Sequence, residues 1–170
     1  AGTGGGDPHL AETMEIIREI ARENDLNFRV ATIGAEMPRD VVKAAVRARK
    51  VTAIGPISAL TEAEVDGAAR IVGHMGMEAF QRAIDLEPDI IIAGRACDTA
   101  IYATLPQRLG FPVGPALQMA KIIECASLCC EGGGRDAMLG TLEGESFVLE
   151  SMTPNRRATP MSVAAHSLYE

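Results

Sequence analysis

The 170 residues are enough for one domain with a sizeable core, and we expect a single α/β domain over residues 1–170. The formal net charge is −7, and acidic and basic residues are interspersed along the sequence. Nucleic-acid-binding proteins carry clustered Lys and Arg, so this distribution argues against a nucleic-acid partner. No apolar run could cross a bilayer and no signal peptide opens the sequence, so we expect a cytoplasmic protein without a membrane partner.

A glycine cluster, "AGTGGGDPHL", precedes the first predicted helix, in which Pro8 takes a first helical position and Asp7 is the expected cap. Consecutive glycines let backbone amides converge, and a helix N-terminus adds partial positive charge. Together they favour an anion at Gly4, Gly5 and Gly6. The spacing fits neither a dinucleotide fingerprint nor a Walker loop, so a turn needed only for tight packing is the alternative.

Two short apolar runs, at 27–33 and 89–93, predict neighbouring or near-neighbouring parallel strands, the second covered on both faces. Helical patterns follow both runs, and Thr61 with Glu64 forms a capping box ahead of a helix that should reach about His74. Helices that alternate with buried strands imply a layered α/β fold with a mainly parallel sheet flanked by helices.

The second run ends in "GRACDTA", where ligands of such sheets bind, outside the carboxyl ends of the strands. Arg95 there needs a carboxylate, a phosphate or solvent for its five donors. Asp98 could instead cap the helix that follows, which Pro106 should stop, and Cys97 could be a small buried hydrophobe.

Beyond Pro112 the sequence predicts a buried helix whose polar residues form one seam, Gln118, Lys121 and Glu124. "AMLGTL" and "SFVLES" flank "EGE" as a C-terminal β-hairpin, and a last helix starts at Thr159. The cysteines of "ECASLCC" lack zinc-ribbon spacing and have no histidine pair nearby, so we interpret them as reduced core thiols and predict no metal site.

These patterns combine into one hypothetical site, because two strand-to-helix turns of a parallel sheet open on the same edge. A carboxylate would be held by Arg95 and the glycine-loop amides, and Cys97 is a further substrate-binding candidate. Asp98 is the first candidate for proton transfer, and Asp7 with His9 is the second. The sequence does not indicate which cofactor, if any, the protein uses.

Several long motifs carry a resemblance to a known family: "GGGDPHL", "LTEAEVDGAARIVGHMGMEAF", "GRACDTA", "GFPVGPALQMAKIIECASL" and "RRATPMSVAAHSLYE". On these the sequence resembles the acyclic terpene utilisation family, the AtuA-like proteins. The resemblance implies an interior piece of a longer chain, and a role in catabolism of acyclic terpenes such as citronellol and geraniol through acyl-CoA thioesters. The incomplete sheet would then have a bare edge, from which we expect a homo-oligomer.

Two functions follow from the resemblance. In the first, the protein is an enzyme, a lyase or hydratase, that acts on a small anionic substrate, a branched carboxylate or its acyl-CoA. In the second, it is a non-catalytic scaffold subunit of such a pathway, and the polar seam meets another chain.

Overall fold

The computed structural model describes residues 4–132, 134 and 136–169, and the chain divides into two compact units. Unit 1 comprises Ala1–Met75 and Ala83–Ala96, and unit 2 comprises Gly76–Arg82 and Cys97–Glu170. The single domain expected from the length stays a prediction, which a single cooperative unfolding transition would support.

The elements of unit 1 are α1 (Asp7–Glu23), β1 (Val30–Ile33), α2 (Arg39–Arg47), α3 (Glu62–Gly67) and β2 (Ile90–Ala93). Helix α4 (Met77–Ile84) begins in unit 2 and ends in unit 1. The further elements of unit 2 are α5 (Asp98–Arg108), α6 (Val113–Ile123), the 3-10 helix η1 (Ala126–Cys129), β3 (Met138–Glu143), β4 (Ser146–Ser151) and α7 (Pro160–Tyr169).

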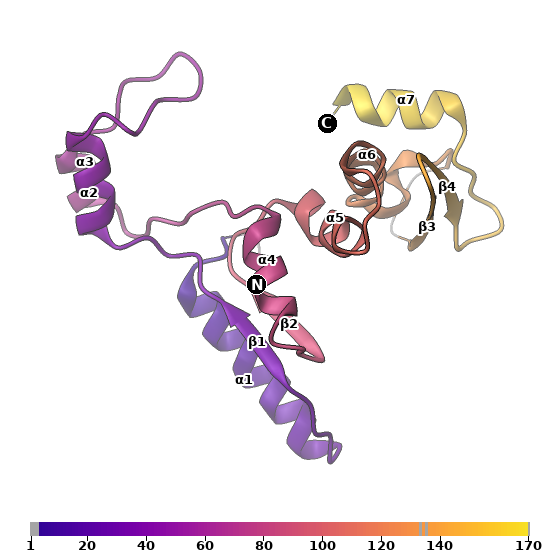
Figure 1. The fold of residues 1–170 in the computed structure, drawn as a ribbon, viewed down its shortest axis with the longest axis horizontal. Helices are drawn as coiled ribbons and strands as arrows, with labels where there is room; N and C mark the ends of the chain where they lie inside the picture. Colours follow the sequence, from indigo (N-terminus) through magenta and orange to yellow (C-terminus); the bar gives the residue numbers. More distant parts are fainter. Residues whose placement is uncertain (1–3, 133, 135, 170) are drawn as a thin grey trace. The chain divides into compact units, whose positions relative to one another are not determined.

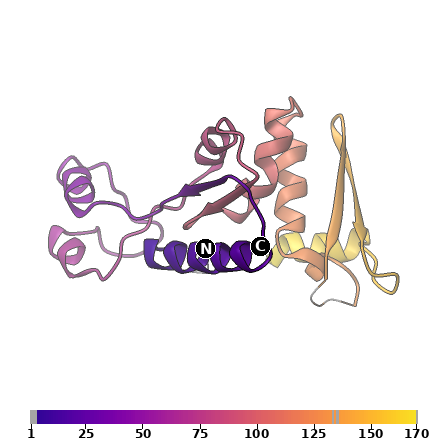
Figure 2. The same cartoon turned by 90° about the horizontal axis from the view of Figure 1, so that it is seen from below.

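In unit 1, β1 and β2 pair in parallel with Val30 opposite Ile90 and Ile33 opposite Ala93, which confirms the predicted neighbouring strands. Helix α1 runs alongside the two strands (Figure 1 and Figure 2). The expectation that the second strand is covered on both faces was wrong: all four residues of β2 are half-buried. Successive residues of a strand point to opposite faces, so both faces of β2 are only partly covered.

Helix α3 begins with the predicted capping box, because Thr61 and Glu64 exchange hydrogen bonds between side chain and backbone. The helix ends at Gly67, however, and does not continue to His74. Residues 71–73 instead lie beside residues 35–37, where the Gly73 amide donates to the Ala35 carbonyl at 2.7 Å. Residues 71–73 use their backbone groups for this pairing, so α3 does not extend through them.

In unit 2, α5 and α6 lie side by side, and α6 also contacts the β3–β4 hairpin and α7 (Figure 2). The hairpin is antiparallel and turns between Glu143 and Ser146, as predicted. Its inward face packs on a core of Ile122, Cys129 and Cys130, which also contacts Met138, Phe147, Leu149, Ala158 and Val163. The fold is therefore mixed α/β, with a small parallel sheet and a C-terminal hairpin.

Helix α5 does not stop at Pro106 but runs through it to Arg108. The proline removes one N–H donor in the last turn, and the amide of Leu109 still closes that turn by donating to the Leu105 carbonyl at 3.0 Å.

None of the described helices has the length and apolar character that crossing a membrane would require.

Candidate functional site

In unit 1 the glycine loop meets the carboxyl ends of both parallel strands. The Arg95 amide donates to the Gly5 carbonyl at 2.9 Å, and the Gly94 amide donates to the Ile33 carbonyl at 2.8 Å. A Cβ atom on Gly94 would lie 2.6 Å from Ala35 Cβ and 2.6 Å from the Gly5 carbonyl oxygen. Gly5 has a φ of +61°, and its Cβ would lie 2.4 Å from the Arg95 nitrogen. Only glycine fits at these two positions, so tight packing is one role of the loop.

Glu36 organises this junction, although no motif in the sequence indicated it. Its Oε1 accepts a hydrogen bond from the Asp7 amide at 3.1 Å, and its two carboxylate oxygens accept from Arg70 Nη1 at 2.9 and 3.1 Å. The prediction that Asp7 caps α1 was wrong: the cap position is Gly6, which makes no side-chain cap bond. Asp7 is the acidic residue of the first turn, and the carboxylate that accepts the Asp7 amide belongs to Glu36, 29 residues further along the chain.

The side chain of His9 lies against the glycine loop, close to Glu36. A Cβ on Gly4 would lie 3.2 Å from His9 Cε1, and one on Gly6 would lie 3.0 Å from Glu36 Oε1 and 3.8 Å from His9 Nδ1. The structure therefore brings together His9, Glu36 and the loop, while both His9 and Asp7 are exposed. Their catalytic roles stay predictions.

A polar hollow of about 320 Å³ adjoins this junction in unit 1. Its charged lining residues are Asp7, Glu36, Arg39 and Arg70. Arg39 Nε donates to the Val65 carbonyl at 3.2 Å, and Arg70 holds Glu36. Both guanidinium groups thus already bond acceptors of the protein itself.

Arg95 finds part of its hydrogen bonding in the backbone. Its Nε and Nη2 donate to the carbonyl of Ala96 at 3.1 and 2.6 Å. The Ala96 carbonyl thus satisfies some of the five N–H donors of the Arg95 guanidinium. The role of Arg95 in substrate binding stays a prediction.

In unit 2, α5 begins one residue earlier than a cap at Asp98 would require. Cys97 takes the cap position without a side-chain cap bond, and Asp98 is the exposed first residue of the helix, so the interpretation of Asp98 as the cap was wrong. Cys97 is half-buried rather than a buried hydrophobe, because its side chain lines a pocket.

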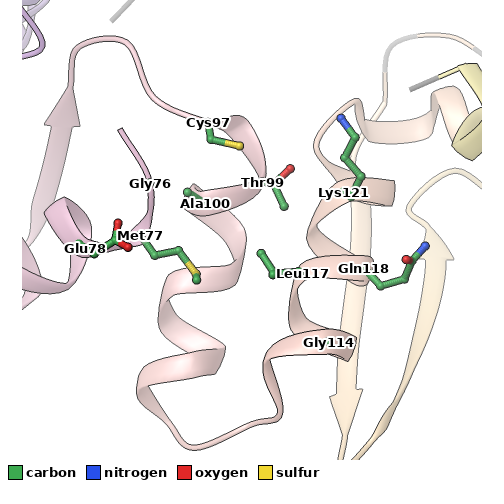
Figure 3. Close-up of a pocket in the computed structure, with 10 residues that line it drawn as sticks. All are labelled: Gly76, Met77, Glu78, Cys97, Thr99, Ala100, Gly114, Leu117, Gln118 and Lys121. Carbon is green, nitrogen blue, oxygen red and sulfur yellow. The ribbon is translucent and has the colours of Figure 1, made fainter. Parts of the chain in front are cut away.

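This pocket has a volume of about 530 Å³ and lies wholly in unit 2. Figure 3 shows its lining residues on α4, α5, α6 and the residues just before α4 and α5: Gly76, Met77, Glu78, Cys97, Thr99, Ala100, Gly114, Leu117, Gln118 and Lys121. The four residues from α6 recur at a spacing of three, one and three, which places them on one face of the helix. Pockets of roughly 300–1,000 Å³ are typical of small-molecule sites.

The predicted polar seam supplies the charged end of the pocket. Lys121 Nζ lies 2.6 Å from Glu124 Oε1, and the hydroxyl of Thr99 donates to Glu124 Oε2. The Glu124 side chain is only 7% exposed, so its charge is buried behind Lys121 and Thr99. Gly114 lies two turns away on the same face of α6, next to apolar Leu117. The pocket therefore joins a charged end at Lys121 to an apolar stretch at Leu117 and Gly114, and Glu78 on α4 adds a second charged residue to the lining (Figure 3).

Two of the predicted core thiols are confirmed, because Cys129 and Cys130 are buried and none of the four cysteines forms a disulfide. Burial, reinforced by the neighbouring Cys130, raises the pKa of Cys129 to about 11. Cys129 is therefore protonated and unreactive at neutral pH. Among the described residues, no three His, Cys, Asp or Glu side chains form a group that could hold a metal ion.

Comparison with known proteins gives one family. The model of the acyclic terpene utilisation family protein AtuA matches residues 2–143, which is most of the chain. No curated protein matches the chain, and no solved structure does.

Proposed function

Because the chain belongs to the acyclic terpene utilisation family AtuA, which implies a role in acyclic terpene utilisation, we propose a more specific function for it. Unit 2 binds the acyl group of a branched carboxylic acid or of its CoA thioester. The protein is an enzyme, a lyase or hydratase, that acts on this acyl group.

The observation that carries this proposal is the pocket between α5 and α6. Its body is apolar, with Met77, Ala100 and Leu117 as lining residues, and its polar end holds Lys121 and Thr99. A branched hydrocarbon chain with one oxygen-bearing head group has the same distribution of apolar and polar surface. Burial of such a chain contributes about 0.8 kcal/mol for each CH₂ group.

The polar end also supports chemistry at a carbonyl. When a hydratase adds water to a double bond conjugated with a thioester, hydroxide adds to the β-carbon, a proton adds to the α-carbon, and negative charge develops on the carbonyl oxygen. The ammonium of Lys121 could donate a hydrogen bond to that oxygen and stabilise the charge. Among the predicted proton-transfer residues, Asp98 belongs to unit 2 and directly follows Cys97, which lines the pocket.

The scaffold hypothesis has less support. It assigned the seam of Gln118, Lys121 and Glu124 to a contact with another chain. In unit 2, Gln118 and Lys121 line the pocket, and Lys121 pairs with Glu124. The seam therefore has a role inside one chain, which favours the enzyme.

Filling the pocket from its apolar end tests the proposal. A Cβ on Gly114, which lines the pocket, would meet no atom within 4 Å, so Gly114→Leu starts its side chain in open space at this end of the pocket. We expect the chain to bind the carboxylic acids that correspond to citronellol and geraniol, or their N-acetylcysteamine thioesters, by isothermal titration calorimetry. Gly114→Leu should weaken this binding by about tenfold or more, since it occupies the space of two or more CH₂ groups.

Gly114→Ala is the matched control. Both variants carry the same backbone restriction, because residue 114 precedes Pro115, but alanine leaves the pocket open. Its affinity should lie within about threefold of wild type, which is under 1 kcal/mol. Equal affinity in the leucine variant, or no binding by the wild-type chain, would contradict the proposal.

A further inference from the structure

We infer that the pocket of unit 2 selects the uncharged form of the acyl group, an amide, ester or thioester, over the free carboxylate. This inference rests on the proposed function, because it takes binding of an acyl chain in this pocket as given. It adds which chemical form of the head group the charges admit.

The charges around the pocket do not leave a cation for a carboxylate. Among the described lining residues, Lys121 is the one positive side chain and Glu78 is a negative one. Glu124, in contact with Lys121 at 2.6 Å, adds a second negative charge. One positive and two negative charges give the site a formal charge of −1.

The position of Glu124 makes its charge effective. Its side chain is 7% exposed, while that of Lys121 is 41% exposed, so water screens the carboxylate less than the ammonium. The hydroxyl of Thr99 holds the second carboxylate oxygen in place. A ligand carboxylate bound to Lys121 would share one ammonium with Glu124, and two carboxylates that share a site repel each other.

An uncharged carbonyl avoids this repulsion. Its oxygen accepts a hydrogen bond from the ammonium of Lys121 without bringing a second negative charge next to Glu124. The alkyl chain then lies along α6 over Leu117 towards Gly114, where a Cβ would meet no atom within 4 Å. The ammonium is thereby set up to polarise a carbonyl rather than to neutralise an acid.

Two ligands of the same shape test the inference, 4-methylpentanamide and 4-methylpentanoic acid, titrated at pH 7.5 into the whole chain. We expect the wild-type chain to bind the amide at least about fivefold more tightly than the acid, since like charges cost on this scale. Glu124→Gln keeps the size and hydrogen bonding of residue 124 but removes its charge. In this variant the acid should gain about tenfold and become the preferred ligand.

Two control variants make the result specific. Glu62→Gln removes an acidic partner of Arg47 in unit 1 and should leave the preference unchanged. Lys121→Met should weaken binding of the amide. Combined with Glu124→Gln, it should also abolish the reversal of preference from the amide to the acid. The wild-type comparison needs no variant, so it stands even if Glu124→Gln fails to fold.

The outcomes separate the inference from the proposed function. A wild-type chain that binds both ligands and prefers the acid overturns the inference but leaves the pocket as an acyl site. A chain that binds neither ligand overturns both. Preference for the amide that Glu124→Gln leaves unchanged also overturns the inference, because the charge of residue 124 would then not set it.

Discussion

The junction in unit 1 and the pocket in unit 2 both contain glycines and charged side chains, but these residues have different roles in the two regions. At the junction, glycines and charged side chains are occupied by partners within the protein: Gly5 bonds Arg95, and Glu36 bonds Arg70 and the Asp7 amide. In the pocket, Gly114 faces open space, and the Lys121–Glu124 pair borders a cavity of about 530 Å³. In this protein the glycine-rich motif thus serves close packing, whereas the polar stripe on the otherwise apolar α6 borders a cavity.

The largest expected effect concerns the packing role of Gly5. Gly5→Ala should reduce the free energy of unfolding by about 3 kcal/mol or more, because positive φ and a Cβ contact of 2.4 Å with the Arg95 nitrogen both oppose alanine. Urea unfolding measures this change. Gly55→Ala is the matched control, since Gly55 has a φ of +86° but open space around it, and should cost about 1 kcal/mol. Equal costs would show that the close approach at Gly5 is unimportant.

The thiols of unit 2 should differ strongly in reactivity. Cys97 is half-buried and lines the pocket, whereas Cys129 is fully buried with a pKa raised to about 11. At pH 8 about one Cys129 thiol in a thousand would be ionised, so iodoacetamide should label Cys97 at least about a hundredfold faster. Labelling of Cys129 should accelerate as the pH rises towards 11. Peptide mass spectrometry gives both rates, and comparable labelling at pH 8 would contradict the buried position of Cys129.

A smaller effect is expected at Glu36. Glu36→Gln keeps an acceptor for the Asp7 amide but loses the charge that pairs with Arg70, and should cost about 1–2 kcal/mol of the free energy of unfolding. Glu62→Gln removes a more exposed charge that pairs with Arg47 and should cost less than about 0.5 kcal/mol. Chemical unfolding of both variants compares them. A smaller loss at Glu36 than at Glu62 would argue against its role at the junction.

Much of the fold could be predicted from short-range patterns in the sequence. The two short apolar strands, the capping box at Thr61 and the hairpin after Met138 each follow from residues close together in the chain, although the two strands pair across 60 residues, with Val30 opposite Ile90. Two of the errors came from contacts between distant residues. The pairing of residues 71–73 with residues 35–37 ends α3 early, and the carboxylate that accepts the Asp7 amide at the start of α1 is that of Glu36.

The site shows the same limit. The polar seam on α6 was visible at the level of helical periodicity, but the sequence could not show that it faces a cavity rather than another chain. Glu36 could have been identified as a candidate from its position in the sequence, since it follows β1 much as Arg95 follows β2. Ligands of parallel sheets bind at these strand ends. Its partner Arg70 lies 34 residues further along, beyond the reach of any local pattern.

The most direct test of where the acyl group binds uses two methionines as reporters. Met77 lines the pocket of unit 2, and Met37 lines the polar hollow of unit 1. With ¹³C-methyl methionine, titration of 4-methylpentanamide into the chain should shift the methyl resonance of Met77 and leave that of Met37 in place. A shift of Met37 without one of Met77, or no shift of either, would contradict the assignment of the site to unit 2.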